Sequence, residues 1–370
     1  MNENEYDIAV IGAGCAGAMA ALESSKHSAK AVIIERKHEI GVPVKCAECL
    51  CETVLDTLNI SKYSVENKVD SLRFFVDSKE FYFKLPVTFC VLDKSKLQKQ
   101  LIEQALKKSN VELLLAKSVI GLNDDFIKIC DSNNNTSKEL KARIIIACDG
   151  IGSLVARLAG VNTAISPADI AVCAQHTVIT DEDINGLEIH IDNYPGYGWV
   201  FPKGNGIVNA GLGILGGGQE VIKRLEKFLT ARFRKFNSVR ITAGCVPSTV
   251  PNALYKNNVI LAGDAGRLVN PLGGGGIQNA LLTGKLAGCI AGRCIEDKLP
   301  VSCLKAYEDI CKAKIYPRLH VGYKLRKIFA KKPSRLKLVL ALLSVMPKSV
   351  WQIFINSIYY RYIDEAQIFR

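Results

Sequence analysis

The chain has 370 residues, of which 48% are hydrophobic, and this length and composition suffice to bury a sizeable core in two or three domains. No apolar run reaches the roughly 20 residues of a membrane-spanning helix, and the acidic N-terminal segment lacks the basic start of a secretory signal. The 13 cysteines are odd in number and scattered, which argues against a disulfide scaffold. The net charge is +12, and 11 lysines and arginines lie in the stretch 312–360, which contains no acidic residue. We therefore expect a cytoplasmic globular protein with one locally basic segment.

The N-terminal segment reads as a strand, a glycine turn, a helix and a second strand. Residues 6–11 are predicted to form a short buried strand, an Ala-rich helix runs to about residue 25, and the second strand covers 31–35. The turn spaces its glycines as G-x-G-x-x-G at Gly12, Gly14 and Gly17. This spacing allows a tight turn, close approach of a pyrophosphate, and close packing of helix on strand. Glu35, at the end of the second strand, can accept hydrogen bonds from ribose hydroxyls, so the unit predicts a dinucleotide site.

The later segments alternate between two kinds of strand. Residues 69–92 and 170–250 have the composition of antiparallel strands, whereas 142–150 and 259–266 read as buried parallel strands. We therefore predict an α/β (α+β) two-domain fold with a discontinuous Rossmann-like domain, an inserted antiparallel β-sheet domain and a helical basic C-terminal region. The expected ranges are 1–68, 93–168 and 250–300 for the dinucleotide domain, 69–92 and 169–249 for the β-rich substrate domain, and 301–370 for the C-terminal region. A second G-x-G-x-x-G match at 211–216 lacks an acidic strand end and is not expected to bind a dinucleotide.

Two segments indicate which dinucleotide binds. ACDGIGSLVARLAG (147–160) and VILAGDAGRLVNPLGGGGIQNAL (259–281) resemble two motifs of the p-hydroxybenzoate-hydroxylase-type flavoproteins, and this resemblance implies FAD. It places Asp264 on the ribityl chain and the N-terminus of a helix, at Gly276 and Ile277, beside the flavin ring, where it would stabilise the reduced ring. The cofactor contacts that the resemblance implies here, together with the glycine turn, are Glu35, Arg36, Asp149, Gly263, Asp264, Gly275, Gly276 and Ile277.

Within that superfamily, the segment YPGYGWVFPKGNGIVNAGLG (194–213) resembles the Y-x-W-x-F-P signature and following G-x-G of the geranylgeranyl reductases. The resemblance implies an apolar tunnel for a prenyl chain. Its lining would include Tyr194, Tyr197, Trp199, Phe201 and Pro202. For Tyr197 and Trp199, an ordinary aromatic β-core is the alternative.

The segment GVPVKCAECL (41–50) resembles a family segment that usually reads C-G-E-G. Cys46 and Glu48 are kept, whereas Ala47 and Cys49 stand where relatives have glycine. The resemblance implies flavin contacts by Cys46, Ala47 and Cys49. The C-x-x-C spacing also leaves a reversible Cys46–Cys49 disulfide open, whereas a zinc site is not expected because no second cysteine pair has suitable spacing.

Three further cofactor contacts follow from the resemblance. VLDKSKLQKQL (91–101) is similar to the family's D-R-x-x-F-D-x-x-L, with Lys94 in place of the arginine that contacts FAD. Lysine keeps the charge but not the bidentate geometry of arginine. Ala16 occupies the family's phosphate-contact position, and Val119 the position of a backbone contact to adenine.

The resemblance implies a reductase that saturates double bonds of polyprenyl chains in membrane lipids such as digeranylgeranylglycerophospholipid. Hydride would come from reduced FAD and a proton from an acid, with Cys46, Glu48 and Tyr197 as candidate catalytic residues. The electron donor would be a ferredoxin or NAD(P)H. Two alternatives stay open, a flavin monooxygenase (hydroxylase or epoxidase) and a catalytically silent, membrane-associated flavin-binding protein.

The basic C-terminal segment suggests an anionic partner. In YKLRKIFAKK, the apolar Leu325, Ile328 and Phe329 follow helical spacing with lysines and arginines between them. Such a stretch can lie on an anionic membrane surface, so we expect peripheral membrane association. A solvated helix face that covers the core is the alternative, and nucleic-acid binding is not expected because no recognition module accompanies the charges.

Overall fold

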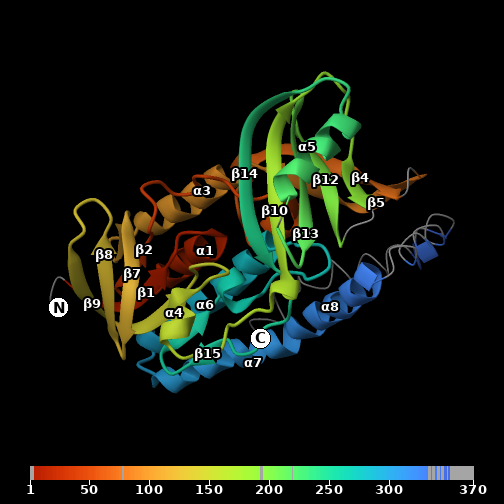
Figure 1. Ribbon diagram of the computed structural model, residues 1–370. Helices are drawn as coiled ribbons and strands as arrows, with labels where there is room; N and C mark the ends of the chain where they lie inside the picture. The colour runs from red at the N-terminus through yellow and green to blue at the C-terminus, as the bar shows by residue number, and fades with distance from the viewer. Residues whose placement is uncertain are drawn as a thin grey trace.

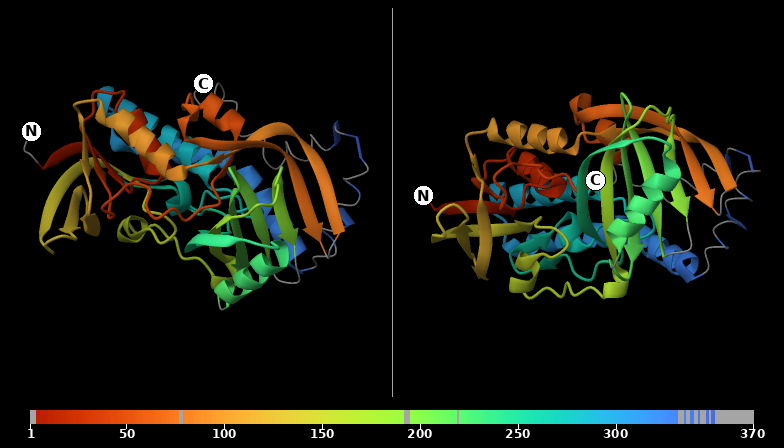
Figure 2. Two further views of the ribbon diagram at one scale, coloured as in Figure 1. Left: turned by 90° about the horizontal axis from the view of Figure 1, so that it is seen from above. Right: turned by 45° about the horizontal axis from the view of Figure 1, so that its top comes forward.

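The computed structural model describes residues 4–331 apart from 77–78, 192–194 and 219, together with 335, 338–339, 342, 346–347 and 349–350. Within this part of the chain, the strands form two eight-stranded sheets that lie toward opposite ends of the molecule (Figures 1 and 2). The predicted tunnel residue Tyr194 and most of the chain beyond 331 lie outside the described residues.

The first sheet is parallel at its centre, where β1, β2, β6, β9 and β16 pair side by side. Its central strands are nearly continuous apolar runs, as expected for strands covered on both faces. The strands are β15 (Tyr255–Lys256), β16 (Val259–Leu261), β9 (Ser137–Ala147), β1 (Glu5–Ile11), β2 (Ala31–Ile34) and β6 (Val111–Leu114), with β8 (Phe126–Asp131) beside β9 and β7 (Lys117–Asn123) beside β8.

The second sheet is antiparallel except where β11 runs parallel to β4. Helix α5 (Val221–Arg232) packs on one face, where Leu225 and Leu229 join the apolar side chains of β10 and β13. The strands, in spatial order, are β14 (Asn237–Pro247), β10 (Ile170–Ile179), β13 (Ile207–Leu215), β12 (Gly196–Gly204), β11 (Leu187–Ile191), β4 (Val65–Val76), β5 (Lys79–Leu92) and β3 (Cys49–Cys51). The opposite face, called the inner face below, carries Trp199 and is the face that the 46–48 loop contacts.

The helices bring distant parts of the first sheet together. Helices α1 and α6 pack so closely that a Cβ at Gly284 would lie 2.2 Å from the carbonyl oxygen of Ala16, and one at Gly288 would lie 2.3 Å from that of Ala20. The helices, apart from α5, are α1 (Cys15–Ser24), α2 (Glu52–Thr57), α3 (Lys94–Leu106), α4 (Leu154–Leu158), α6 (Ile277–Glu296), α7 (Lys305–Lys314) and α8 (Tyr316–Lys331).

The last two helices run one after the other along one side of the molecule, so that α8 reaches beneath the second sheet (Figure 1). Arg326 of α8 is buried and forms an ion pair with Asp169, directly before β10. The opposite side of α8 exposes Val321 and Ile328, with Leu325 half-buried between them. In the described part of the chain, no helix combines the length and the hydropathy that crossing a membrane requires.

The predicted fold class is confirmed, because a mainly parallel sheet with helices is joined to a mainly antiparallel sheet. Two details differ from the expected ranges. The short strand β3 pairs with β5 in the second sheet, and β4 begins at Val65 and not near residue 69. Three residues are too few to show a period, and the polar residues at the start of β4 resemble a loop. The division into domains at the ranges given above stays a prediction.

Candidate functional site

The three glycines of the glycine turn have two different roles: two of them allow close packing, and one leaves space for a ligand. A Cβ at Gly12 would lie 2.6 Å from the carbonyl oxygen of Cys148, and one at Gly17 would lie 1.8 Å from that of Gly12. A Cβ at Gly14 would meet only the amide nitrogen of Gln98, at 3.8 Å. The backbone beside Gly14 is therefore open to a ligand at the N-terminus of α1, where free N–H groups favour a phosphate.

Glu35 contacts this turn across the sheet. One carboxylate oxygen accepts a hydrogen bond from the backbone N–H of Ala13 at 2.7 Å, and the other accepts one from the backbone N–H of Lys37 at 2.9 Å. Strand β7 begins at the same place, since the N–H of Lys117 donates to the carbonyl of Glu35 at 3.0 Å. The exposed Arg36 and, two residues beyond Lys117, Val119 therefore lie near the predicted adenosine end. Their contacts with the cofactor stay predictions.

The three predicted flavin segments meet because they follow parallel strands. Strands β1, β9 and β16 are parallel, so their carboxyl ends share one edge of the sheet. Within two residues of these ends follow Ala13, Cys148 and Ala262, respectively. A Cβ at Gly263 would lie 3.0 Å from that of Ala16, so the first and last segments touch.

The side chains of the two later segments fit a flavin cofactor. Asp149 accepts a hydrogen bond from the N–H of Val155 at 3.2 Å, while its second, buried oxygen has no partner. Burial raises the pKa of Asp264, which lies beside Gly276 at the start of α6. Nothing lies within 4 Å of a Cβ placed at Gly275. An unsatisfied buried acceptor and open backbone at a helix N-terminus suit a polar cofactor with a ring that carries negative charge.

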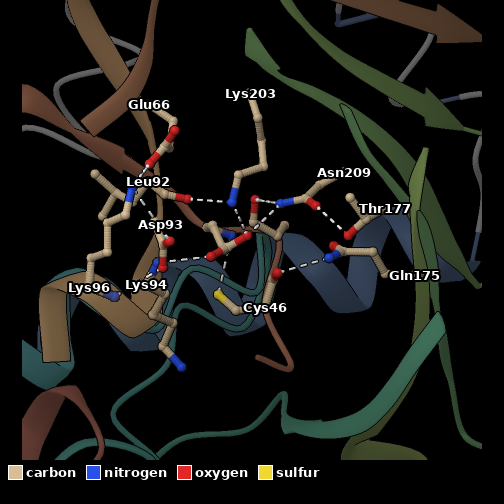
Figure 3. Close-up of polar contacts among 12 residues, drawn as sticks. Cys46, Glu66, Leu92, Asp93, Lys94, Lys96, Gln175, Thr177, Lys203 and Asn209 are labelled. Atoms are coloured by element: carbon tan, nitrogen blue, oxygen red, sulfur yellow. Dashed lines mark hydrogen bonds and ion pairs between the residues drawn. The ribbon is translucent and has the colours of Figure 1, made fainter. Parts of the chain in front are cut away.

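Lys94 supplies a cation to the same region. Burial opposes its charge, but the thiols and carboxylates around it raise the pKa of the ammonium above its usual value. The groups responsible belong to Cys15, Cys46, Asp264 and Glu48. Within the described residues, no carboxylate lies at ion-pair distance from this ammonium, which extends away from the polar cluster of Figure 3. A half-buried cation in this position fits the predicted contact with the FAD pyrophosphate.

Tyr197 and Trp199 of β12 extend from the inner face of the second sheet to the flavin segments. The hydroxyl of Tyr197 donates to the carbonyl of Gly273 at 2.6 Å, and its ring lies 6.0 Å from that of Trp199. A Cβ at Gly211 would lie 2.4 Å from the Trp199 indole, and one at Gly213 3.8 Å. The second glycine match is therefore part of strand β13, where it makes room for the indole, and the expectation that it binds no dinucleotide agrees with this role.

The other two predicted tunnel residues on β12, Phe201 and Pro202, lie on opposite faces of the second sheet. Phe201 packs with Cys49 against the cluster of Val69, Val91 and Leu187 on the inner face. Pro202 takes the alternate strand position, which directs it to the opposite face. The lipid contacts of these residues stay predictions, and the placement of Pro202 does not favour one.

The loop 46–48 is fixed to the inner face through its backbone. Gln175 donates to the carbonyl of Cys46 at 3.0 Å and accepts from the Trp199 indole at 3.0 Å, so it bridges the loop to the aromatic side chains (Figure 3). Asn209 donates to the carbonyl of Ala47 at 3.3 Å. The predicted flavin contacts Cys46 and Ala47 are thereby placed beside Trp199.

Glu48 ends this loop in a fully hydrogen-bonded position. Its carboxylate, 1% exposed, accepts from the N–H of Lys94 at 2.8 Å, from the ammonium of Lys203 at 2.7 Å and from Asn209 at 2.8 Å. Its backbone has a φ of 68°, whereas Ala47 and Cys49 do not take a positive φ. Alanine and cysteine therefore fit at positions 47 and 49 without backbone strain, since of these three residues only Glu48 takes the left-handed conformation.

The thiol of Cys46 lies close enough to Lys94 and Asp264 to be affected by their charges. Burial raises the pKa of its thiol, and the Sγ accepts a hydrogen bond from the N–H of Glu48 at 3.3 Å. Cys46 and Cys49 are free thiols in this structure. Among the described residues, no three His, Cys, Asp or Glu side chains come together in a way that could hold a metal ion.

Four polar residues of this site were missed from the sequence. Gln98 lies one helical turn after Lys94 and faces Gly14, so its i, i+4 spacing was a usable signal. The contacts of Gln175, Lys203 and Asn209 carry no such signal, because each depends on strand pairing with distant segments.

Comparison with known proteins gives matches over both sheets. Residues 7–195 match the family described as FAD dependent oxidoreductase, and residues 169–246 match the geranylgeranyl reductase catalytic domain. A protein of Methanopyrus kandleri named digeranylgeranylglycerophospholipid reductase 2 is 32% identical, with 88% of this chain and 87% of the relative covered.

Two solved structures share the fold. A geranylgeranyl bacteriochlorophyll reductase-like protein from Thermoplasma acidophilum has a TM-score of 0.87 at 25% identity, covering 98% of this chain and 99% of the other. The p-nitrophenol 4-monooxygenase of Pseudomonas putida has a TM-score of 0.79 at 16% identity, with 98% and 99% covered, and shows the fold alone.

The two glycines of the first turn provide a matched test. Gly14→Ala should weaken FAD binding at least about tenfold, since one charge-assisted hydrogen bond is worth about 1.5–3 kcal/mol. It should lower the free energy of unfolding of the apoprotein by about 1 kcal/mol or less, the effect of alanine at the N-cap of α1. Gly17→Ala should instead lower the free energy of unfolding by about 1–3 kcal/mol, because its Cβ meets backbone. Flavin fluorescence titration and urea unfolding of both apoproteins measure the two effects. Equal loss of stability in both variants would contradict the assignment of Gly14 to the ligand.

Proposed function

Because the chain belongs to the geranylgeranyl reductase family of FAD-dependent oxidoreductases, we propose that it saturates double bonds of geranylgeranyl chains carried by a membrane lipid. The family, the oxidoreductase class and the FAD cofactor are those that the motifs predicted, and the family matches confirm them. The observation that carries the proposal is the junction of Tyr197 and Trp199 with the Gly273 carbonyl and the Cys46 loop. The second sheet is, in this proposal, the substrate domain.

The apolar part of the inner face, beyond the polar cluster of Glu48, suits an isolated double bond. When bound and reduced, FAD supplies a hydride to one carbon of such a bond. The apolar residues that continue from Phe201 along β4 and β5 form two adjoining clusters that share Leu72 and Phe89. These clusters give a prenyl chain a water-poor surface on which to lie, and an unactivated alkene requires such a surface because water would compete for the reactive groups.

The second carbon of the double bond needs a proton, and the contacts favour Cys46 as its source. Both oxygens of Glu48 accept hydrogen bonds from N–H groups, and the hydroxyl proton of Tyr197 is directed at the Gly273 carbonyl. The Cys46 thiol accepts a bond from the Glu48 N–H and keeps its own proton, and burial raises its pKa. In the proposed step, the S–H bond breaks as the new C–H bond forms, and the thiolate then takes a proton from water.

The proposal predicts a change in the mass of the lipid. A geranylgeranyl glycerophospholipid in anionic liposomes, incubated without oxygen with dithionite-reduced holoprotein, should gain one pair of hydrogens for each double bond saturated, measured by mass spectrometry. Unchanged lipid with retained flavin would contradict reductase activity on this class and favour a silent flavin-binding protein. An aerobic repeat with NAD(P)H that inserts oxygen would favour a monooxygenase. A ferredoxin or NAD(P)H stays the predicted electron donor.

The same assay tests the thiol. Cys46→Ala should lower the turnover of the lipid about 10²–10⁴-fold, the usual contribution of a general acid, while FAD stays bound. Cys173→Ala is the matched control, because this thiol is also largely buried and lies on the neighbouring strand β10. With Cys46 as donor, turnover should hold into alkaline solution and decline only above the ordinary thiol range, since burial keeps the acid protonated there. Equal turnover in the two variants would refute proton donation by Cys46.

We further propose that α8 lies on an anionic membrane surface, next to the lipid substrate. Its exposed side carries Val321, 49% exposed, and Ile328, 41% exposed, with the exposed Lys324 and Lys327 on the same helix. Basic residues flanking an apolar stripe match a bilayer with anionic head groups, to which each adds about 1 kcal/mol. Its inner side is fixed by Arg326, which pairs with Asp169, so this helix can hold the protein in one orientation.

Replacing an apolar residue of this stripe should release the protein from liposomes. Ile328→Asp is expected to reduce co-sedimentation with phosphatidylserine-containing liposomes at least about tenfold, because burial of an isoleucine contributes about 1.5–3 kcal/mol. Ile222→Asp on α5 is the matched control, since Ile222 is also 41% exposed but lies at the outer face of the second sheet. Similar binding of both variants would exclude α8 as the membrane contact.

A further inference from the structure

We propose that Lys203, which follows the Y-x-W-x-F-P signature, is a positioning residue that sets the Cys46 thiol against the flavin by neutralising Glu48. This inference rests on the proposed function for its consequence in turnover, but its structural basis and its spectroscopic test do not depend on the substrate.

Lys203 reaches Glu48 from the end of strand β12. It follows Tyr197, Trp199 and Phe201 at alternate positions, so its side chain extends from the same inner face. Directly around Lys203, between Pro202 and Gly204, the pairing of β12 with β13 shifts register, an irregularity of a kind that is frequent beside active sites. The Lys203 side chain is 16% exposed, and its ammonium donates to Glu48 at 2.7 Å and to the carbonyl of Leu92 at 2.9 Å.

The ion pair is enclosed at its carboxylate end, while Lys203 keeps a small exposed part. Glu48 is 1% exposed, and Asn209, which donates to the same carboxylate oxygen, is fully buried. Thr177 donates to the Asn209 amide oxygen at 3.4 Å, which orients the amide (Figure 3). Removal of one partner from a buried pair leaves an uncompensated charge, which is strongly destabilising. The other titratable groups that act on this carboxylate or on the thiol of its loop are Lys94, Cys46 and Asp264.

The position of Cys46 depends on this pair. The Glu48 N–H donates to the Cys46 Sγ, and Glu48 takes a left-handed φ that a non-glycine residue keeps only where the surroundings hold it. If the carboxylate loses Lys203, the loop can relax toward water and carry the thiol with it. A displacement of about 1 Å at a reacting group can lower a rate about 10²-fold.

A second lysine in the same region forms an exposed ion pair and therefore provides a matched control. Lys96 pairs with Glu66 at 2.6 Å, near Lys203 in Figure 3, but its side chain is 44% exposed. Exposed pairs contribute little to stability. Lys96→Met therefore removes the same charge and the same hydrogen-bonding group from the same region without uncovering a buried carboxylate.

The test compares Lys203→Met, Lys96→Met and the double variant Glu48→Gln/Lys203→Met as flavin-loaded proteins. Lys203→Met should shift the flavin absorption bands and lower kcat for the lipid about 10–100-fold with little change in KM. Its flavin retention should fall as the pH rises, because the unpaired carboxylate is costly only when it is charged. Lys96→Met should match the wild type in every measurement.

The double variant makes the test decisive. With a neutral amide in place of Glu48, it should lose the pH dependence and regain at least part of the wild-type spectrum, because no buried charge is left unpaired. If Lys203→Met does not fold, a folded, flavin-binding double variant supports the pairing. A double variant no better than Lys203→Met, or a Lys203→Met protein with the wild-type spectrum and pH profile, would overturn the proposal. Absence of lipid reduction by the wild type, with these spectral effects intact, would refute the proposed function alone.

Discussion

The buried carboxylate of Glu48 joins three parts of the chain that are far apart in sequence, namely its own loop, the start of α3 and the β12–β13 pair. It receives hydrogen bonds from the start of α3, from the end of β12 and from β13, while its own backbone carries the loop that places Cys46. A charge in this position is tolerated only because a lysine and two further donors compensate for the loss of water. Helix α3 and the second sheet therefore meet through a satisfied polar cluster, and we expect the geometry of the site to depend on keeping that cluster complete.

Glycines around this cluster allow helices and an aromatic side chain to pack directly against backbone atoms, and so fix where these larger groups lie. Gly17 allows α1 to rest on its own turn, and Gly284 allows α6 to rest on Ala16, so both helices direct their N-termini to the same edge of the first sheet. Gly211 provides the space for Trp199 in the same way. A flavin bound at the sheet edge would thus face aromatic side chains whose position is set by glycine on the neighbouring strand.

The basic helix α8 is linked to the same loop that Tyr197 contacts. A Cβ at Gly322 would lie 3.1 Å from the side-chain oxygen of Asn270, which accepts hydrogen bonds from the N–H groups of Leu272 and Gly273. The carbonyl of Gly273 in turn accepts the Tyr197 hydroxyl. A helix proposed to lie on the membrane therefore packs directly beneath the flavin loop, which would bring a lipid surface close to the aromatic side chains without any domain motion.

The sequence alone determined the first dinucleotide unit, the cofactor class and the family, because these follow from short motifs whose residues are close together in the chain. The placement of Gly14, Glu35 and Asp264 at one edge of the sheet could be predicted in this way, since parallel strands bring their carboxyl ends together whatever the connections between them. It did not reveal that β3 belongs to the second sheet or that Pro202 faces away from Trp199. The partners of Glu48 also had to come from the tertiary structure. Lys203 and Asn209 lie more than 150 positions along the chain from it, and only the pairing of β12 with β13 in the folded protein directs both side chains to one carboxylate.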